Sequence, residues 1–349
     1  MSAGSFCFTG AAELIYNLII HGNWFHVPEE IGKRGITMQE HEIKFKSDRL
    51  ELAGTVALPD SGGPFPGVLF IAGSGQVDRN ENHKKIRLNA FYDISHYLAQ
   101  NGIASLRYDK RGVGQSDGDF WATGLYDNAQ DAQAALQYLK QQKNIQPENI
   151  FILGHSEGAF IATKLAGGGA EVAGIILLAG GAQSGEAVLK WQVIQVTKGL
   201  KGINGWLIKI LRINVSKAQE KQIDKIKQSK KDLYRQQLIA KINAKWLREF
   251  MAYDPASDLA RITVPVLAIT GSKDIQVDPA DLERMAHIVK APFELHLIQG
   301  MTHMLRIEEG DATISKYKEE IKKPIEPKVL EIVLRWLENR IDLRSKSQT

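Results

Sequence analysis

Cysteine is almost absent from this sequence, in which Cys7 stands alone. A single cysteine excludes a disulfide within the chain, so nothing marks an oxidising compartment. Long hydrophobic runs are missing too: the apolar patch Leu14 to Ile20 is far shorter than the roughly 18 residues that span a bilayer. The patch lacks a basic start and a small-residue cleavage site, which favours a short amphipathic helix over a signal peptide. We expect a soluble, cytoplasmic protein, with export after signal removal as the alternative.

Nucleotide-binding motifs and internal repeats are also missing. The glycines have neither Walker nor dinucleotide-binding spacing, and no segment is of low complexity. At 44% hydrophobic and 24% charged residues, the composition is that of an ordinary globular protein. The net charge is only +4, yet residues 184–250 hold fifteen Lys and Arg against five Asp and Glu. No recognised nucleic-acid-binding motif accompanies this charge, so we expect no nucleic-acid partner.

Strands and helices alternate through most of the chain. Two segments with alternating polar and apolar residues predict an antiparallel pair, and continuous apolar runs separated by amphipathic segments predict buried strands joined by helices. The predicted strands are His41–Lys46, Leu50–Leu58, Val68–Ala72, Ile103–Tyr108, Ile150–Leu153, Val172–Leu178, Val264–Thr270 and Phe293–Gln299. The predicted helices are Ile86–Gln100, Leu125–Gln142, Glu157–Ala166, one starting near Pro279, and Glu326 to about Ile341. Because strands joined through helices run parallel, we expect a doubly wound, mostly parallel eight-stranded sheet with helices on both faces.

One segment interrupts this alternation. Residues 184–250 are lysine-rich, with a helical pattern and no strand signal. We predict that residues 41–183 and 251–349 form the core, that 184–250 form a helical cap inserted after the sixth strand, and that 1–40 are an N-terminal segment of unassigned role. The charge of the cap suits a solvated outer face; the alternative is that it draws anionic substrates or interfaces toward the site.

Ser156 lies in the strongest motif of the sequence. A predicted strand ends just before it and a predicted helix starts just after it, while Gly154 and Gly158 complete a G-x-S-x-G pattern. The serine of such a nucleophile elbow needs a strained backbone, and a side chain at either glycine would collide with the neighbouring strand or helix. We predict that this turn raises the Ser156 hydroxyl above the edge of the sheet, beside the positive end of the helix.

An acid and a base are expected where strands end, because function gathers at the carboxyl ends of such a sheet. Asp274 follows the strand that ends at Thr270, and His303 follows the last strand. We predict that His303 takes the proton of Ser156 and that Asp274 fixes the tautomer of His303. Asp278 is the alternative acid, although its place before a proline suits a helix N-cap.

Three other histidines fit the role of base less well. His296 lies inside a predicted strand, His287 lies in a predicted helix, and His155 precedes the serine and points the other way in the turn. We interpret all three as packed, solvated or structural residues.

A tetrahedral intermediate also needs hydrogen-bond donors for its oxyanion. The backbone N–H of Glu157, the residue after the nucleophile, is one predicted donor. The second should come from the glycine-rich loop after the strand that ends at Ala72. Ser74 is the first choice there, with Gly75 and Gln76 as alternatives.

These motifs resemble the α/β-hydrolase superfamily over roughly residues 41–342. Within it, the chain is similar to bacterial carboxylesterases and serine aminopeptidase-like hydrolases that carry a helical cap. Residues 73–80, Gly-Ser-Gly-Gln-Val-Asp-Arg-Asn, look like the oxyanion loop of these proteins. Ala72 stands where many relatives have a histidine, which leaves the backbone donors intact but weakens the assignment to a subfamily.

The segment 107–116 looks like the loop that these proteins carry after their fourth strand. The resemblance implies that Asp109 and Arg111 pair to hold the rim of the site, and that Gly112 and Gly114 permit turns.

Together these features predict a serine hydrolase that cleaves small carboxylic esters through an acyl-enzyme, with no metal or organic cofactor. An acyl thioesterase and an aminopeptidase-like amidase use the same machinery and are the alternatives. A non-catalytic ligand-binding relative is less favoured, because such proteins usually lose a member of the triad. We expect no stable membrane insertion, with the basic cap as the surface for any interfacial contact; the oligomeric state is open.

Overall fold

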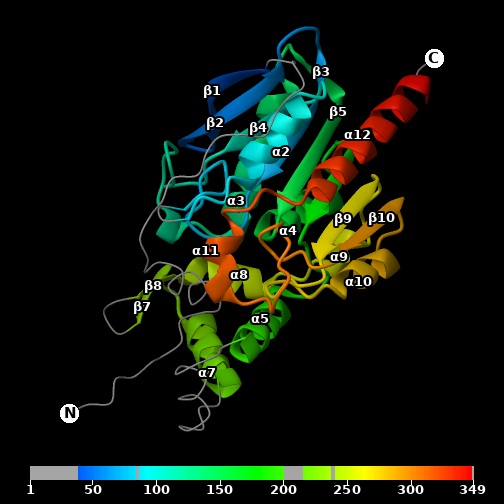
Figure 1. Cartoon of the computed structure of the whole chain (residues 1–349). Helices are drawn as coiled ribbons and strands as arrows, with labels where there is room; N and C mark the ends of the chain where they lie inside the picture. Colours follow the sequence, from blue (N-terminus) through cyan, green and yellow to red (C-terminus); the bar gives the residue numbers. More distant parts are fainter. Residues whose placement is uncertain (1–37, 84–85, 200–214, 237–239, 348–349) are drawn as a thin grey trace.

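The computed structural model describes residues 38–83, 86–199, 215–236 and 240–347 (Figure 1). Within these residues, eight strands form one sheet in the order β1-β2-β4-β3-β5-β6-β9-β10. They are Met38–Ser47 (β1), Leu50–Pro59 (β2), Phe65–Ile71 (β3), Ala104–Tyr108 (β4), Ile145–His155 (β5), Gly174–Leu178 (β6), Val266–Gly271 (β9) and Phe293–Ile298 (β10). β2 runs antiparallel to β1 and β4, and every other neighbouring pair is parallel. The predicted eight-stranded, mostly parallel sheet is confirmed.

Helices cover both faces of this sheet, as predicted. α2 (Ala90–Ala99) and α12 (Pro327–Ser347) pack on one face, and α3 (Leu125–Lys140), α4 (Glu157–Gly167) and α10 (Asp281–Ile288) pack on the other. Three short helical turns are Phe120–Ala122 (η1), Ile314–Lys316 (η2) and Tyr317–Glu320 (α11).

The sequence of the central strand β5 does not alternate between polar and apolar residues, because both of its faces are buried. Phe151 and Leu153 belong to the apolar cluster under α2 and α12, whereas Ile150 and Ile152 belong to the cluster under α3 and α4. Both sets are fully buried, so every position of the strand favours an apolar side chain.

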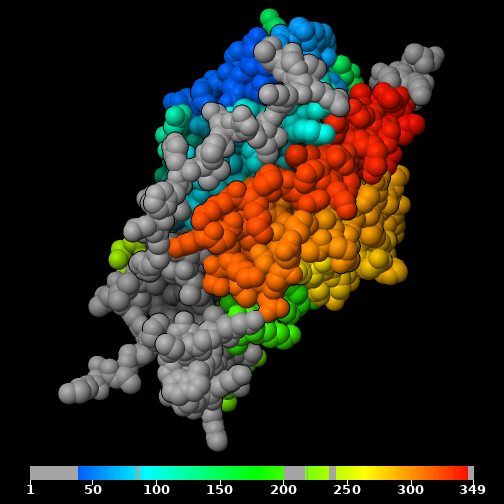
Figure 2. Space-filling view, in the orientation of Figure 1, coloured from blue at the N-terminus to red at the C-terminus, as the bar shows by residue number. Residues whose placement is uncertain are grey.

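The segment that follows β10 and the helix α12 at its end form one continuous band across the molecule in the space-filling view (orange to red in Figure 2). No helix in the described part of the chain is long and apolar enough to cross a membrane.

Several predicted boundaries moved, among them the start of β5, which lies at Ile145 and not at Ile150. α2 was predicted from Ile86 but begins at Ala90, because Asn89 adopts a left-handed conformation with φ of 50° and cannot continue a helix. Asn82 holds that conformation, since its side chain exchanges hydrogen bonds of 2.7 and 2.9 Å with the side chain and backbone of Asn89. β1 begins at Met38, three residues before its predicted start. The rest of the predicted N-terminal segment lies outside the described residues.

The segment between β6 and β9 is not purely helical, so that prediction was wrong. It contains α5 (Gly185–Gly199), α7 (Val215–Gln228), β7 (Leu233–Gln236), β8 (Ala240–Asn243), α8 (Ala244–Ala252) and α9 (Ala256–Leu259). β7 and β8 pair antiparallel as a separate two-stranded sheet (lower left in Figure 1). Each strand has only four residues, too few for a period of two to stand out among the surrounding lysines. Residues 200–214 and 237–239 of the predicted cap lie outside the described residues, and the division into core and cap stays a prediction.

Candidate active site

Ser156 occupies a strained turn between β5 and α4. Its φ of 54° and ψ of −118° lie outside the regions that a residue with a side chain normally adopts. A Cβ at Gly154 would approach the Gly158 carbonyl oxygen to 2.1 Å, and a Cβ at Gly158 would approach the Ile71 carbonyl oxygen in β3 to 1.8 Å. Both glycines are therefore required by close backbone contacts, one with the helix and one with the neighbouring strand. The geometry is that of a nucleophile elbow.

The loops after β9 and β10 pack against each other and bring Asp274 to His303. A Cβ at Gly271 would lie 2.0 Å from the Met301 carbonyl oxygen, so only glycine permits this approach. The Nδ1 atom of His303 lies 2.8 Å from Oδ2 of Asp274, and both residues are 3% exposed. The other carboxylate oxygen of Asp274 accepts the backbone N–H groups of residues 276 and 277 at 2.7 and 2.9 Å. The carboxylate is thus fixed in position.

Asp278, the alternative acid, makes different contacts. Its side chain accepts the Ala280 N–H at 3.1 Å and pairs with Arg284 at 2.8 Å. These contacts hold the turn before α10, which begins at Asp281 and has Ala280 at its N-cap position. Asp278 therefore lies two residues before the N-cap position, so its interpretation as the N-cap was wrong.

Two of the alternative histidines lie away from this pair. His287 is exposed on α10. His296 lies in the edge strand β10, with its Nε2 atom 2.8 Å from the Glu294 carboxylate. Neither shares a contact with Ser156 among the described residues.

His155, interpreted as structural from the sequence, lies between the elbow and the loop of His303. Its Nε2 atom is 3.1 Å from the His303 carbonyl oxygen, and the two imidazole rings are 5.0 Å apart. Its Nδ1 atom is 2.9 Å from Oε1 of Glu81, which also accepts the Gly73 N–H at 2.8 Å. Glu81 and His155 therefore join the oxyanion loop, the elbow and the histidine loop. The contact with His303 joins the loop of the predicted base to the residue that precedes Ser156.

The Glu81 and His155 side chains form a buried pair in which each group favours the charged form of the other. Burial opposes ionisation of Glu81, but the charge of His155 and hydrogen bonds from His155 and Gly73 outweigh it, and the pKa of Glu81 is lowered. Burial likewise favours neutral His155, but the charge of Glu81 and its hydrogen bond outweigh burial and raise the pKa of His155. The sequence analysis missed Glu81; its one signal is the run of polar residues from Asp78 to Asn82, which begins within the predicted oxyanion loop and extends past its end.

The two predicted oxyanion segments both lie beside Ser156. A Cβ at Gly73 would lie 3.4 Å from Cβ of Ser156, so the loop that carries Ser74 passes directly by the nucleophile. Glu157 is the first residue of α4, where backbone N–H groups have no partner within the helix. Its carboxylate is buried and accepts hydrogen bonds from Lys110 at 3.1 Å and from Asn128 at 2.7 Å.

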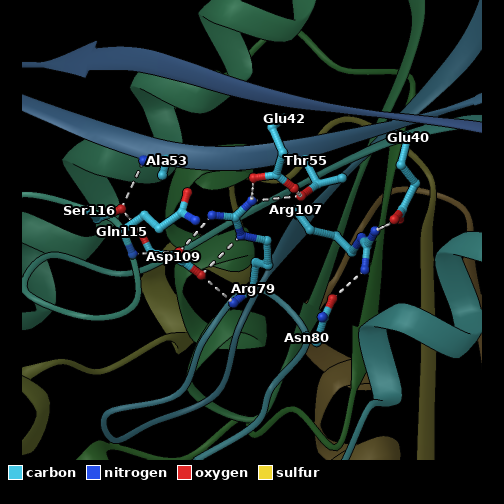
Figure 3. A network of polar contacts seen from close by, with 10 residues as sticks. All are labelled: Glu40, Glu42, Ala53, Thr55, Arg79, Asn80, Arg107, Asp109, Gln115 and Ser116. Atoms are coloured by element: carbon cyan, nitrogen blue, oxygen red, sulfur yellow. Dashed lines mark hydrogen bonds and ion pairs between the residues drawn. The ribbon is translucent and has the colours of Figure 1, made fainter.

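Arg79 anchors the far end of the oxyanion loop to the strands (Figure 3). Its guanidinium donates to both carboxylate oxygens of Asp109, at 3.1 and 2.8 Å, and its backbone N–H donates to the same group at 2.8 Å. A third guanidinium nitrogen reaches Glu42 in β1 at 2.5 Å and Thr55 in β2 at 2.7 Å. The loop is therefore tied to two strands and to the loop after β4.

The predicted pair of Asp109 and Arg111 is wrong. Arg111 instead binds the carboxylate of Asp131 on α3, at 2.6 and 2.8 Å. The two side chains diverge because Asp109 is occupied by Arg79 and the chain turns sharply after Arg111, with φ of 67° at Gly112. The turns expected at Gly112 and Gly114 are present, since Gly114 has φ of 57°.

A second arginine completes this network. Arg107 in β4 is buried and binds both Asn80 in the oxyanion loop and Glu40 in β1 (Figure 3). Burial lowers the pKa of Arg107, and the charge of Glu40 partly offsets that shift. Arg79 and Arg107 are thus two buried cations that fix neighbouring residues of the same loop.

Comparisons with known proteins identify the family of the chain. The family model described as serine aminopeptidase, S33, matches residues 87–310, which is more than half of the chain. Esterase EstD of Thermotoga maritima is 27% identical over 288 residues, which cover 82% of this chain and 65% of that protein. The chain therefore spans a little less than two thirds of the length of this relative.

Solved structures share the fold. Est1E of Butyrivibrio proteoclasticus, with ferulic acid bound, matches with a TM-score of 0.58 and 19% identity, over 86% of this chain and 99% of that chain. A proline iminopeptidase of Mycobacterium smegmatis matches with a TM-score of 0.58 and 14% identity, over 87% of this chain and 100% of that chain. At these identities the likeness concerns the fold alone, and it is the fold predicted from the sequence.

Proposed function

Because the chain belongs to the serine aminopeptidase S33 family of α/β-hydrolases, we propose that it is a serine hydrolase that cleaves carboxylic esters through an acyl-enzyme. The observation that carries this proposal is the hydrogen bond of 2.8 Å between Asp274 and His303, whose carbonyl oxygen contacts His155, the residue before the strained elbow serine. The name of the relative EstD supports an ester as the substrate.

The proposed reaction begins with proton transfer. Asp274 accepts the Nδ1–H of His303, which leaves Nε2 unprotonated and able to take the proton of the Ser156 hydroxyl. The serine oxygen then attacks the ester carbonyl, and the carbonyl oxygen becomes an oxyanion. Collapse of this intermediate releases the alcohol, which receives the proton from His303. Water, activated by the same imidazole, then hydrolyses the acyl-enzyme and restores Ser156.

The proposed oxyanion donors are the backbone N–H groups of Ser74 and Glu157. Support comes from the position of Gly73 beside Ser156 and from the position of Glu157 at the start of α4. Backbone donors fixed by a folded scaffold stabilise developing charge without reorganising during the reaction.

Amides and thioesters are the competing substrate classes, since the family is described by an aminopeptidase. A panel of p-nitrophenyl esters, acyl-CoA thioesters and aminoacyl anilides separates the three, with Ser156→Ala as the control in each assay. We expect the highest kcat/KM for an ester and loss of several orders of magnitude in the variant. Higher kcat/KM for an anilide or a thioester would replace the ester assignment, and no turnover of any substrate would favour a ligand-binding protein.

We further propose that residues 184–250 are a cap over the site and contact substrates or anionic interfaces through their positive charge. Support comes from the fifteen basic and five acidic residues of this segment and from its insertion between β6 and β9. A cytoplasmic location is proposed from the single cysteine.

A further inference from the structure

A lysine outside the triad holds the peptide group between Gly73 and Ser74. The Nζ atom of Lys110 donates to the Gly73 carbonyl oxygen at 2.6 Å and to the Glu157 carboxylate at 3.1 Å. The side chain of Lys110 is 6% exposed, and that of Glu157 is 2% exposed. Burying an ammonium group is costly unless its partners are well placed, so these two contacts account for its position.

The contact with Gly73 fixes more than one atom. In a trans peptide the C=O and N–H groups are coplanar and point in opposite directions. A cation that holds the Gly73 carbonyl oxygen therefore sets the direction of the Ser74 N–H, the proposed oxyanion donor. The preceding peptide is held as well, because the Gly73 N–H donates to Glu81 at 2.8 Å.

The contact with Glu157 reaches the second donor segment. The carboxylate of Glu157 sits on the residue whose backbone N–H is the other proposed donor, and Asn128 holds its second oxygen at 2.7 Å. One ammonium group thus connects the two segments that carry the donors. Because the carboxylate offsets the charge of Lys110, the pair adds little net field at Ser156. Lys110 therefore affects the oxyanion through the position of the two backbone N–H donors and not through its own charge.

We propose that Lys110 is a positioning residue of the oxyanion hole, which sets the direction of the Ser74 N–H and its place relative to the Glu157 N–H. This inference rests on the proposed function and deepens it. Donors aimed at the oxyanion act in the tetrahedral stage, so their misalignment lowers kcat more than it changes KM. Loss of one such donor costs about 10²- to 10³-fold in kcat, and we expect misalignment in Lys110→Met to cost about 10- to 100-fold.

The test compares three variants. Lys110→Met keeps the aliphatic stem and removes the ammonium group, but it leaves the Glu157 carboxylate buried without its cation. The double variant Lys110→Met/Glu157→Gln removes both charges and keeps the test valid if the single variant fails to fold. Arg111→Met is the matched control, because it removes the next cation of the same loop, whose carboxylate partners are Asp131 and Asp127 on α3.

Each variant is measured for thermal unfolding, turnover of p-nitrophenyl acetate and affinity for phenylboronic acid, which forms a tetrahedral adduct with a catalytic serine. The proposed function is tested separately: the wild type should turn over the ester, and Ser156→Ala should abolish this turnover. For the folded Lys110 variants we expect equal loss in kcat and in boronate affinity, with KM changed by less than about threefold. The kcat of Arg111→Met should stay within about threefold of wild type.

Three results would overturn the role of Lys110. The first is a folded double variant with wild-type kcat. The second is a lower kcat with unchanged boronate affinity, which would place the effect outside the tetrahedral stage. The third is an equal loss of kcat in Arg111→Met, which would assign the effect to the loop as a whole.

Discussion

Asp274 uses its two carboxylate oxygens differently, and this makes one substitution informative. Oδ1 accepts two backbone N–H groups, so in Asp274→Asn the amide oxygen stays there and the amide nitrogen faces His303. An amide nitrogen donates to Nδ1, which forces the proton onto Nε2 and prevents His303 from accepting the serine proton. We predict a loss of about 10⁴-fold in kcat for ester hydrolysis.

Asp278→Asn is the matched control for this prediction. Asp278 holds the turn before α10, and its partner Arg284 is 43% exposed. We expect a change of roughly 1 kcal/mol or less in the free energy of unfolding and little change in kcat. The opposite ranking of the two variants would assign the acid to Asp278.

The buried pair of Glu81 and His155 makes stability depend on pH. The lowered pKa of Glu81 stabilises the fold above the ordinary carboxyl value of 4.5, and this stability is lost as the pH falls through the lowered pKa. The raised pKa of His155 stabilises the fold below the ordinary value of 6.5, and this stability is lost as the pH rises through the raised pKa. Both contributions are present between those two ordinary values.

We therefore predict that Glu81→Gln is most destabilising near pH 6, by about 3 kcal/mol in the free energy of unfolding. The difference from wild type should shrink as the pH falls through the lowered pKa of Glu81 or rises through the raised pKa of His155, because one partner then loses its charge. Chemical denaturation across a series of pH values measures this difference. A constant difference across the series would show that the charged pair is not the source of the stability.

At the scale of elements, the contact between α4 and β3 depends on Gly158. A Cβ there would lie 1.8 Å from the Ile71 carbonyl oxygen, and neither backbone can move without separating helix and strand. We predict that Gly158→Ala lowers the free energy of unfolding by about 3 kcal/mol or more and abolishes ester turnover.

Gly199→Ala tests whether this effect is specific to the elbow. A Cβ at Gly199 would meet its nearest neighbour at 3.5 Å, an ordinary contact at the end of α5. Its stability should stay within about 1 kcal/mol of wild type. A stable, active Gly158→Ala protein would contradict the packing described for the elbow.

The positive charge of the segment between β6 and β9 leads us to predict how kcat/KM depends on the salt concentration. α7 alone carries four lysines against two acidic residues. If this charge draws anionic substrates, raising salt from 0.1 to 1 M shortens the screening length from about 10 to about 3 Å and lowers kcat/KM for an anionic ester. A neutral ester of the same acyl length should respond little. An equal response of the two esters would assign the charge to a solvated surface.

At the scale of the whole molecule, the sequence predicted the sheet and the order of its elements because periodicity and chain connectivity determine both. Ser156, Asp274 and His303 could be proposed because each directly follows a predicted strand, and parallel strands end at one edge of a sheet. The hydrogen bond between Asp274 and His303 agrees with that expectation.

Contacts between distant segments could not be predicted in the same way. Arg79 and Asp109 are 30 residues apart, whereas Asp109 and Arg111 are neighbours and invited the wrong pairing. Glu81 and Lys110 were missed because a charged residue in a polar loop is normally exposed, and only the folded chain shows that both are buried. The short strands β7 and β8 escaped detection because four residues do not establish a period.

The central claim is that Ser156 is a nucleophile activated by His303. A fluorophosphonate probe forms a covalent bond only with a serine activated in this way, and mass spectrometry of the intact protein and its peptides locates the added mass. We predict one probe per chain, bound at Ser156, with labelling lost in Ser156→Ala and slowed by about 10²-fold or more in His303→Ala. An unlabelled wild-type protein, or a probe bound at another residue, would contradict the account.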